Sequence, residues 1–220
     1  QPSQQRLKAG NACPGSFHYL GAVDPMDHQG AQRFILTELH AGLPDFRTYH
    51  SLEHTLDVHD SAVRLAEQEG ISGDELVLLK TAALFHDAGF MVMPHKHEQG
   101  SCLLAREHLP RFGYDAQAVE RICHTIMCTV VPQVADDVLS KVLCDADLDY
   151  LGRDDFFTIG DRLYEELRAE GALASRREWN QRQEAFIAKH RYYTATSRLL
   201  REARKQQHLE TIRQQLGQEG

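Results

Sequence analysis

Apolar residues recur along most of the chain every three to four positions, which is the spacing of one face of an α-helix. In residues 31–41, this spacing places Ile35 and Leu39 on one side. No segment alternates convincingly between apolar and polar residues, as a half-buried β-strand does. The predicted helices cover residues 31–41, 51–69, 73–87, 98–109, 116–128, 136–151 and 154–170 and a C-terminal section from Arg176. Asp115 and Asp154 are predicted to cap the helices that follow them. The pattern therefore predicts an all-α fold.

The predicted helix over residues 73–87 is apolar on nearly all of its sides, which is typical of a helix in the centre of a protein. Its last part reads "AALFHDAGF", so that a buried run ends in His86 and Asp87. Gly89 is suited to end this helix, and Pro94 prevents it from resuming at once. Burying a histidine beside an aspartate costs free energy unless a partner compensates, and a bound metal ion is one such partner.

The composition is that of an ordinary soluble globular protein, with 220 residues of which 42% are hydrophobic and 25% are charged. This length suits one sizeable domain, and no linker rich in Pro, Gly or Ser divides the chain. The formal net charge of -8 disfavours a nucleic-acid polymer as partner, because such a partner usually requires a basic face. A small phosphorylated substrate, held by a metal ion and a few cations, is compatible with this charge.

The five cysteines are odd in number and include no CxxC pair, which predicts mostly buried free thiols in a reducing compartment and hence a cytoplasmic location. No apolar run is long enough to span a membrane, and Gln1–Gln5 show no signal-peptide pattern. Five large apolar or aromatic residues of the C-terminal helices are expected to pack on the rest of the chain or on a second copy in a homo-oligomer. They are Phe186, Tyr192, Tyr193, Leu199 and Leu200.

Histidine and aspartate side chains occur at four places where the pattern otherwise predicts a buried core. The four places are His50 with His54, His86 with Asp87, His95 and His97 with the later His124, and the group Asp145, Asp147 and Asp149. Taken singly, each has an ordinary explanation as a hydrogen-bonded core histidine, a polar loop residue or a helix cap. Their order along the chain is what indicates a shared metal site.

In this order the sequence resembles the HD-domain superfamily of metal-dependent phosphohydrolases, whose motif runs His … His-Asp … Asp. The matching residues are His54, His86, Asp87 and Asp147. The segment "YHSLEHTLDV" is similar to the first signature of the cyclic-nucleotide phosphodiesterases, and "CDADLDYLG" is similar to the last HD motif, in which the aspartate after alanine is the ligand. The resemblance implies one helical domain over residues 1–220. Its HD-domain-like bundle covers about 45–152, and additional C-terminal helices cover 153–220.

The resemblance also implies a chemistry, because it makes His54, His86, Asp87 and Asp147 the ligands of a divalent ion. Two imidazoles and two carboxylates suit Mn, Fe, Co, Ni, Zn or Mg better than a thiolate-seeking metal. Such an ion activates water for attack on a phosphoester, with Asp87 as a catalytic residue as well as a ligand. By similarity with the phosphodiesterases, His50 is the predicted proton donor for the leaving group. The predicted enzyme is a phosphohydrolase acting on a nucleotide or another small phosphoester, phosphodiesters included.

The number of metal ions stays open, because His97 and His124 lie where some HD proteins carry ligands for a second ion. A dinuclear centre would allow an iron oxygenase instead, and a catalytically silent nucleotide-binding domain is a third alternative. Lys96 and Arg153 are candidate phosphate-binding residues. The phosphodiesterase resemblance also has gaps. After His-Asp the chain reads Ala-Gly-Phe rather than the acidic and histidine continuation of that family, and no purine-binding glutamine is identified.

Overall fold

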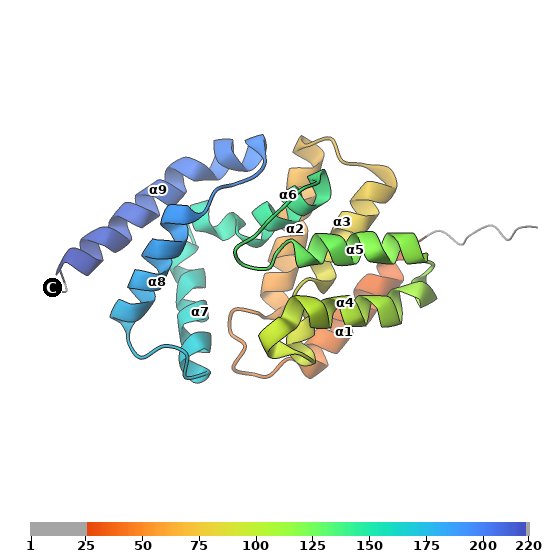
Figure 1. Cartoon of the computed structure of the whole chain (residues 1–220), viewed down its shortest axis with the longest axis horizontal. Helices are drawn as coiled ribbons and strands as arrows, with labels where there is room; N and C mark the ends of the chain where they lie inside the picture. Colours follow the sequence, from red (N-terminus) through yellow and green to blue (C-terminus); the bar gives the residue numbers. More distant parts are fainter. Residues whose placement is uncertain (1–25, 219–220) are drawn as a thin grey trace, which may run out of the picture.

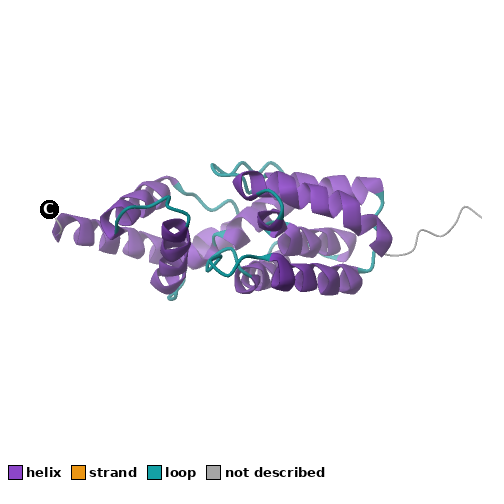
Figure 2. Cartoon of the chain, turned by 90° about the horizontal axis from the view of Figure 1, so that it is seen from below, coloured by secondary structure: helices purple, strands orange, loops and turns teal. Residues whose placement is uncertain are grey.

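The computed structural model describes residues 26–218, and helices with their connecting loops make up all of this part of the chain (Figure 1). No strand occurs among these residues (Figure 2). The all-α prediction is therefore confirmed. The predictions for Gln1–Gln5 and for Cys13 fall outside the described residues.

Nine α-helices are present between residues 26 and 218. They are α1 (His28–Gly42), α2 (Leu52–Gln68), α3 (Gly73–Phe85), α4 (His97–His108), α5 (Ala116–Met127), α6 (Val138–Asp147), α7 (Phe156–Ala169), α8 (Arg176–Lys189) and α9 (Ala195–Gln218). Short 3₁₀ helices connect some of them, namely η1 (Ala88–Met91), η2 (Pro94–Lys96), η3 (Leu109–Phe112) and η4 (Asp149–Gly152).

Helices α1, α2, α4, α5 and α6 pack around α3, which supplies the centre of the larger hydrophobic core. Leu79, Leu84 and Phe85 of α3 are fully buried there, which confirms the prediction of a central helix. Removing each such side chain from water contributes about 1.5–3 kcal/mol. A second apolar cluster joins η4 to α7, α8 and α9. These last three helices form the opposite end of the elongated molecule in Figure 1.

The structure corrects three details of the predicted elements. Helix α3 ends at Phe85, and Gly89 lies in η1, where an added Cβ would collide with the carbonyl oxygen of His97. Gly89 is therefore needed for the close packing of η1 on α4 rather than to end a helix. The helix predicted over 136–151 is broken after Asp147, and a short 3₁₀ helix follows.

Of the two predicted helix caps, one is confirmed and one is wrong. The carboxylate of Asp115 accepts a hydrogen bond from the N–H of Ala118 in the first turn of α5. The residue before α7 is Asp155, whereas the Asp154 carboxylate pairs with Arg204 of α9.

The four cysteines among residues 26–218 are all free and buried, as predicted. The reducing compartment and the cytoplasmic location stay predictions. Within the same part of the chain, none of the helices has both the length and the apolar composition that crossing a membrane requires.

Candidate metal centre and cavity

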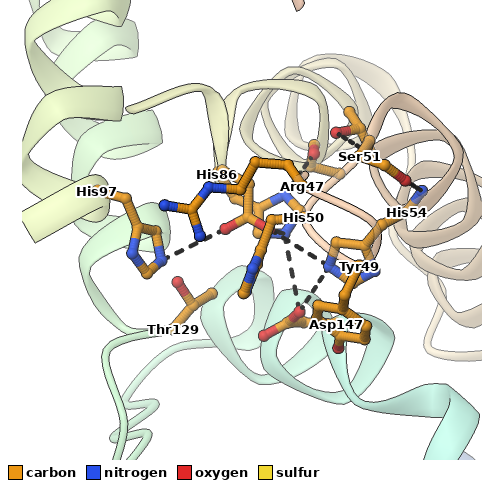
Figure 3. A network of polar contacts seen from close by, with 12 residues as sticks. Arg47, Tyr49, His50, Ser51, His54, His86, His97, Thr129 and Asp147 are labelled. Atoms are coloured by element: carbon orange, nitrogen blue, oxygen red, sulfur yellow. Dashed lines mark hydrogen bonds and ion pairs between the residues drawn. The ribbon is translucent and has the colours of Figure 1, made fainter. Parts of the chain in front are cut away.

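Side chains from three helices converge at the centre of the molecule. His54 comes from the first turn of α2, His86 and Asp87 follow the end of α3, and Asp147 is the last residue of α6. The Nε2 atom of His54 lies 3.4 Å from Asp87 Oδ2 and 3.3 Å from Asp147 Oδ1. The Nε2 atom of His86 lies 3.2 Å and 3.7 Å from the same two oxygens. These distances bring the four ligands expected from the sequence together, and Figure 3 shows His54, His86 and Asp147 among them.

Local structure fixes the orientation of these side chains. Ser51 caps α2, with its hydroxyl accepting from the N–H of His54, so that His54 is held in the first helical turn. His86 Nδ1 lies 2.8 Å from the carbonyl oxygen of Ala83. Because a carbonyl only accepts, Nδ1 carries a proton and Nε2 is the nitrogen that faces the cluster. On the far side, Gln133 donates a hydrogen bond to Asp147 Oδ2.

Three atoms at the centre of the cluster are buried and have no hydrogen-bond partner: His54 Nε2, His86 Nε2 and Asp87 Oδ2. An unpaired buried polar atom typically costs about 1–3 kcal/mol. Burial favours a neutral acid at Asp147, but the neighbouring His54 and His86 outweigh it and lower the pKa of Asp147 to about 2. The same carboxylates raise the pKa of His54 and raise that of His86 well above its ordinary value, against the effect of burial. Without an ion, the cluster therefore pairs ionised carboxylates with protons on the imidazoles, and a divalent ion would bind by displacing these protons.

These observations fit a divalent metal ion. With metal–ligand bonds of about 2.1 Å, the ligand atoms of a tetrahedral site lie about 3.4 Å from one another. The separations of 3.2–3.7 Å in the cluster have this size. His54, His86 and Asp147 also form a group whose ligand atoms all lie within 4.8 Å of one another. An ion bound there would give the three unpaired atoms the partner that they lack.

Asp145, the alternative ligand two residues earlier, is used elsewhere. Its carboxylate accepts hydrogen bonds from the backbone N–H groups of Tyr193 and Thr194 and from the Thr194 hydroxyl. It thereby fixes the connection between α8 and α9, and the geometry leaves Asp147 to face the histidines.

His97, at the start of α4, lies on the side of the cluster opposite His54 in Figure 3. Its Nε2 atom is 3.4 Å from Asp87 Oδ1 and 3.2 Å from Glu98 Oε1. Phe90 stacks on the His97 ring with the centroids 4.0 Å apart, and the His50 ring lies 4.2 Å from Phe90. The centroids of the His50 and His97 rings are 6.0 Å apart, so both histidines contact the same phenyl ring and lie beside each other.

His50 lies before α2, which begins at Leu52, so His50 and His54 are not one turn apart on the same helix. Instead, His50 Nδ1 lies 2.5 Å from Oε1 of Glu166, a fully buried residue of α7. Glu166 Oε2 accepts from the backbone N–H groups of Tyr49 and His50. Burial opposes ionisation of Glu166, but His50 and Arg47 outweigh it and lower the pKa of this carboxyl to about 2. Glu166 is therefore an anion that fixes the His50 ring.

The whole segment from residue 47 to residue 50 is joined to α7. Arg47 donates to Glu166 and pairs with Glu170 at 2.7 Å, and the Thr48 hydroxyl donates to a backbone carbonyl of α7. Sequence reasoning missed Glu166. Its signal is faint: Glu166 follows Leu163 by three positions, which places a charge on the apolar face of α7.

A cavity of about 370 Å³ opens from the cluster towards the C-terminal helices. His50, Asp87, His97, Glu98 and Asp147 contribute to one end of it. The other end is mostly apolar and is lined by Val131, Leu148, Tyr150, Leu151, Phe156, Leu163, Trp179, Phe186 and Ile187, with Arg182 and Gln183. Sequence reasoning expected Phe186 to pack on the core or on a second subunit and did not place it at the site.

The remaining predicted site residues, Lys96, Arg153 and His124, make none of the contacts described for the cluster. Lys96 is exposed in η2. Arg153 pairs with Asp57 and Asp155 and lies 3.6 Å from Asp149, so its charge is matched by carboxylates. His124 is exposed on α5. Its role as a ligand of a second ion beside His97, and the phosphate-binding roles of Lys96 and Arg153, stay predictions.

Comparison with known proteins adds a family to this geometry. A family model described as HD domain matches residues 51–149. The fold is similar to that of a predicted HD superfamily hydrolase from an uncultured Thermotogales bacterium, with a TM-score of 0.56 and 22% identity over 86% of this chain and 92% of that chain.

The fold is also similar to that of Bacillus subtilis YpgQ, with a TM-score of 0.61 and 24% identity over 86% of this chain and 95% of YpgQ. For YpgQ in complex with ADP the TM-score is 0.60, with 22% identity over 85% of this chain and 94% of that chain. At such identities the likeness concerns the fold. No curated protein matches the chain.

Proposed function

Since the chain belongs to the HD-domain superfamily, we propose that it is a metal-dependent phosphohydrolase acting on a nucleotide or another small phosphoester. The observation that carries this proposal is the cluster of two histidines and two aspartates with three unpaired buried atoms. Asp87 and Asp147 of this cluster line the polar end of a cavity large enough for a small molecule.

His54, His86, Asp87 and Asp147 are the proposed ligands of the ion. A divalent ion bound there supplies Lewis-acid polarisation of the phosphoryl group and activates water for attack. The donor set suits Mn, Fe, Co, Ni, Zn or Mg. With an ion bound, the two carboxylates would offset its positive charge and the two buried histidines would be its nitrogen ligands.

His50 is the proposed proton donor for the leaving group. Its Nδ1 is held by Glu166, so its Nε2 is the nitrogen that exchanges a proton at the cavity, where His50 contributes to the wall. The buried anion of Glu166 fixes the orientation of the His50 ring through Nδ1. Glu166 is a positioning residue in this scheme, because it acts through His50.

The cavity supports a substrate with an apolar or aromatic part beside its phosphate. Its far end is mostly apolar, while its near end carries the polar groups of the cluster. A nucleoside monophosphate, a nucleoside diphosphate or a cyclic nucleotide would match this division. The ADP bound to YpgQ is consistent with a nucleotide in a related fold.

The test is elemental analysis of the purified protein, followed by assay of the metal-loaded enzyme against a panel of phosphoesters. The panel contains nucleoside monophosphates, diphosphates and triphosphates, cyclic nucleotides and sugar phosphates, with a chelated sample as control. We expect metal-dependent phosphate release from at least one nucleotide. Nucleotide binding without hydrolysis across the panel would instead support a silent regulatory domain. Two irons per chain with oxygen consumption would support the oxygenase.

A further inference from the structure

Three potential ligand side chains meet at the C-terminal end of α5, outside the cluster described above. His124 and Cys128 are four residues apart in sequence and face the same side of the helix end. Asp136 approaches them from the connection between α5 and α6. His124 Nε2 lies 2.8 Å from Asp136 Oδ1 and 3.9 Å from Cys128 Sγ. The three ligand atoms all lie within 4.8 Å of one another.

We propose that His124, Cys128 and Asp136 form a second metal site, separate from the HD cluster, that binds Zn²⁺ or a similar thiolate-binding divalent ion. A thiolate, an imidazole and a carboxylate are each established zinc ligands, and water completes a four-coordinate site. On binding, the Cys128 thiol gives its proton to the solvent and the sulfur bonds to the ion. The exposed His124 and Asp136 leave an open path for the ion to enter.

The donor set distinguishes this site from the HD cluster. The cluster offers two imidazoles and two carboxylates, whereas the α5 site adds a sulfur atom. Soft ligands such as thiolate favour zinc over magnesium and calcium. Two sites of different softness on one chain would bind different ions from the same mixture.

A simple surface ion pair looks different elsewhere on this protein. His59 Nδ1 lies 3.1 Å from Asp60 Oδ1, and the Asp60 side chain is 68% exposed, as is that of Asp136. His59 and Asp60 are not part of a group of three ligand atoms among the described residues. This pair is therefore a matched control for the α5 site.

The position of the site suggests what it does. Cys128 and Asp136 stand at the two ends of the α5–α6 connection, so an ion between them closes this segment into a loop. The middle of the connection contributes Val131 to the cavity wall and Gln133 to the hydrogen bond with Asp147. A bound ion would thus fix the segment that supports one ligand of the HD cluster.

Cobalt absorption spectroscopy on the full chain tests the proposal, because a thiolate bound to Co²⁺ gives a charge-transfer band in the near ultraviolet. The HD cluster has no sulfur ligand and cannot produce this band. Titrating wild-type protein with Co²⁺ should produce the band at the intensity of one thiolate-bound ion per chain, with up to two equivalents bound in total because the HD cluster also takes Co²⁺. Asp87→Asn, which disables the HD cluster, should leave the band in place.

Two variants of the site and two controls make the result specific. Cys128→Ser should abolish the band. Asp136→Asn should weaken Co²⁺ binding at least about tenfold, since even the loss of a hydrogen-bond partner of a metal ligand costs this much. Cys13→Ser and Asp60→Asn should leave the band unchanged. Circular dichroism shows whether each variant is folded, and the exposed Asp136 is the substitution least coupled to the core.

Absence of the band in folded wild-type protein overturns the proposal. Its persistence in Cys128→Ser also overturns it, because another thiol would then be the ligand. An unchanged Co²⁺ affinity in Asp136→Asn would show that Asp136 is not a ligand. His124 and Cys128 alone both belong to the end of α5, so an ion bound to them could not join the two ends of the α5–α6 connection, and the proposal would fail.

Discussion

The cluster at the ends of α2, α3 and α6 and the helices α7 and α8 meet at the same cavity, but they bring different chemistry to it. The first set supplies the two histidines and two aspartates of the cluster. The second set supplies the apolar wall and the buried Glu166 that holds His50. Metal binding and proton donation are thus proposed to depend on different parts of the chain, and single substitutions should separate them.

The largest effect is expected on the side of the cluster. Asp87→Asn keeps the shape of the side chain but removes its charge, so the remaining ligands bind the ion far more weakly. We expect loss of bound metal and a fall in turnover of about a thousandfold or more. Metal content and hydrolysis rate measure both. Asp74→Asn, an exposed substitution in the first turn of α3, is the control, and full metal content in Asp87→Asn would contradict the assignment.

His50→Ala tests the other side, because this residue is not a ligand of the cluster. The protein should keep its metal but lose about 10²–10⁴ in turnover, the usual contribution of a general acid. The loss should be greatest for esters with poor leaving groups. His40→Ala, an exposed residue of α1, serves as control. If mutant and wild type hydrolyse such esters equally fast, His50 is not the acid.

Glu166→Gln, a substitution in α7, should cause part of the loss of turnover expected for His50→Ala. The neutral amide no longer holds His50 Nδ1 as the carboxylate does, so the ring loses its orientation and kcat should fall about ten- to a hundredfold, with little change in KM. Added to His50→Ala, the substitution should have no further effect on kcat, since both act through one proton. Additive losses in the double variant would make Glu166 a purely structural residue. Thermal unfolding monitors the cost of leaving Arg47 unpaired.

Phe186→Ala addresses the apolar end of the cavity. Removing one aromatic wall should raise KM for a nucleotide about tenfold, because stacking of a base on an aromatic side chain is worth about 1–3 kcal/mol. The effect should vanish for a sugar phosphate, which has no aromatic part. Phe157→Ala, a half-exposed neighbour on α7 outside the cavity wall, is the control. Equal KM increases for both substrate types would indicate that the whole site is distorted.

The smallest effect concerns stability against pH. The pKa of Glu166 is depressed from an ordinary 4.5 to about 2, so its stabilising contribution is complete above pH 4.5 and declines as the pH falls towards 2. The difference in free energy of unfolding between wild type and Glu166→Gln should therefore narrow by about 1 kcal/mol between pH 4.5 and pH 3.5. Urea unfolding at the two pH values measures it. A constant difference would show that Glu166 is not the titrating group.

The sequence predicted the two halves unequally, for a physical reason. The central helix and its His86–Asp87 ending are visible in the pattern because burial and periodicity are local properties of neighbouring residues. Motif order then brought His54 and Asp147 to the same point. The break after Asp147 and the early end of α3 are tertiary effects, since packing of η1 and η4 overrides the local helical preference.

The contribution of α7 and α8 could not be read in the same way. Glu166 and His50 are 116 positions apart, and no local pattern links an acid on one helix to a loop so distant. The apolar residues of α8 have the sequence pattern of ordinary packing residues, and only the folded structure shows that they line the cavity. Similarly, the path of the α5–α6 connection brings Asp136 within 2.8 Å of His124, and hydrophobic periodicity does not predict the path of a connection.

The distance in sequence between His50 and Glu166 also has a consequence for biosynthesis. A chain made from its N-terminus completes the four proposed ligands with Asp147, before Glu166 has been added. On the proposed roles, a growing or truncated chain would gather its ion while its acid is still unfixed. The chain would then become active only when α7 packs on residues 47–50. Turnover would therefore require α7 to be in place, whereas metal content would not.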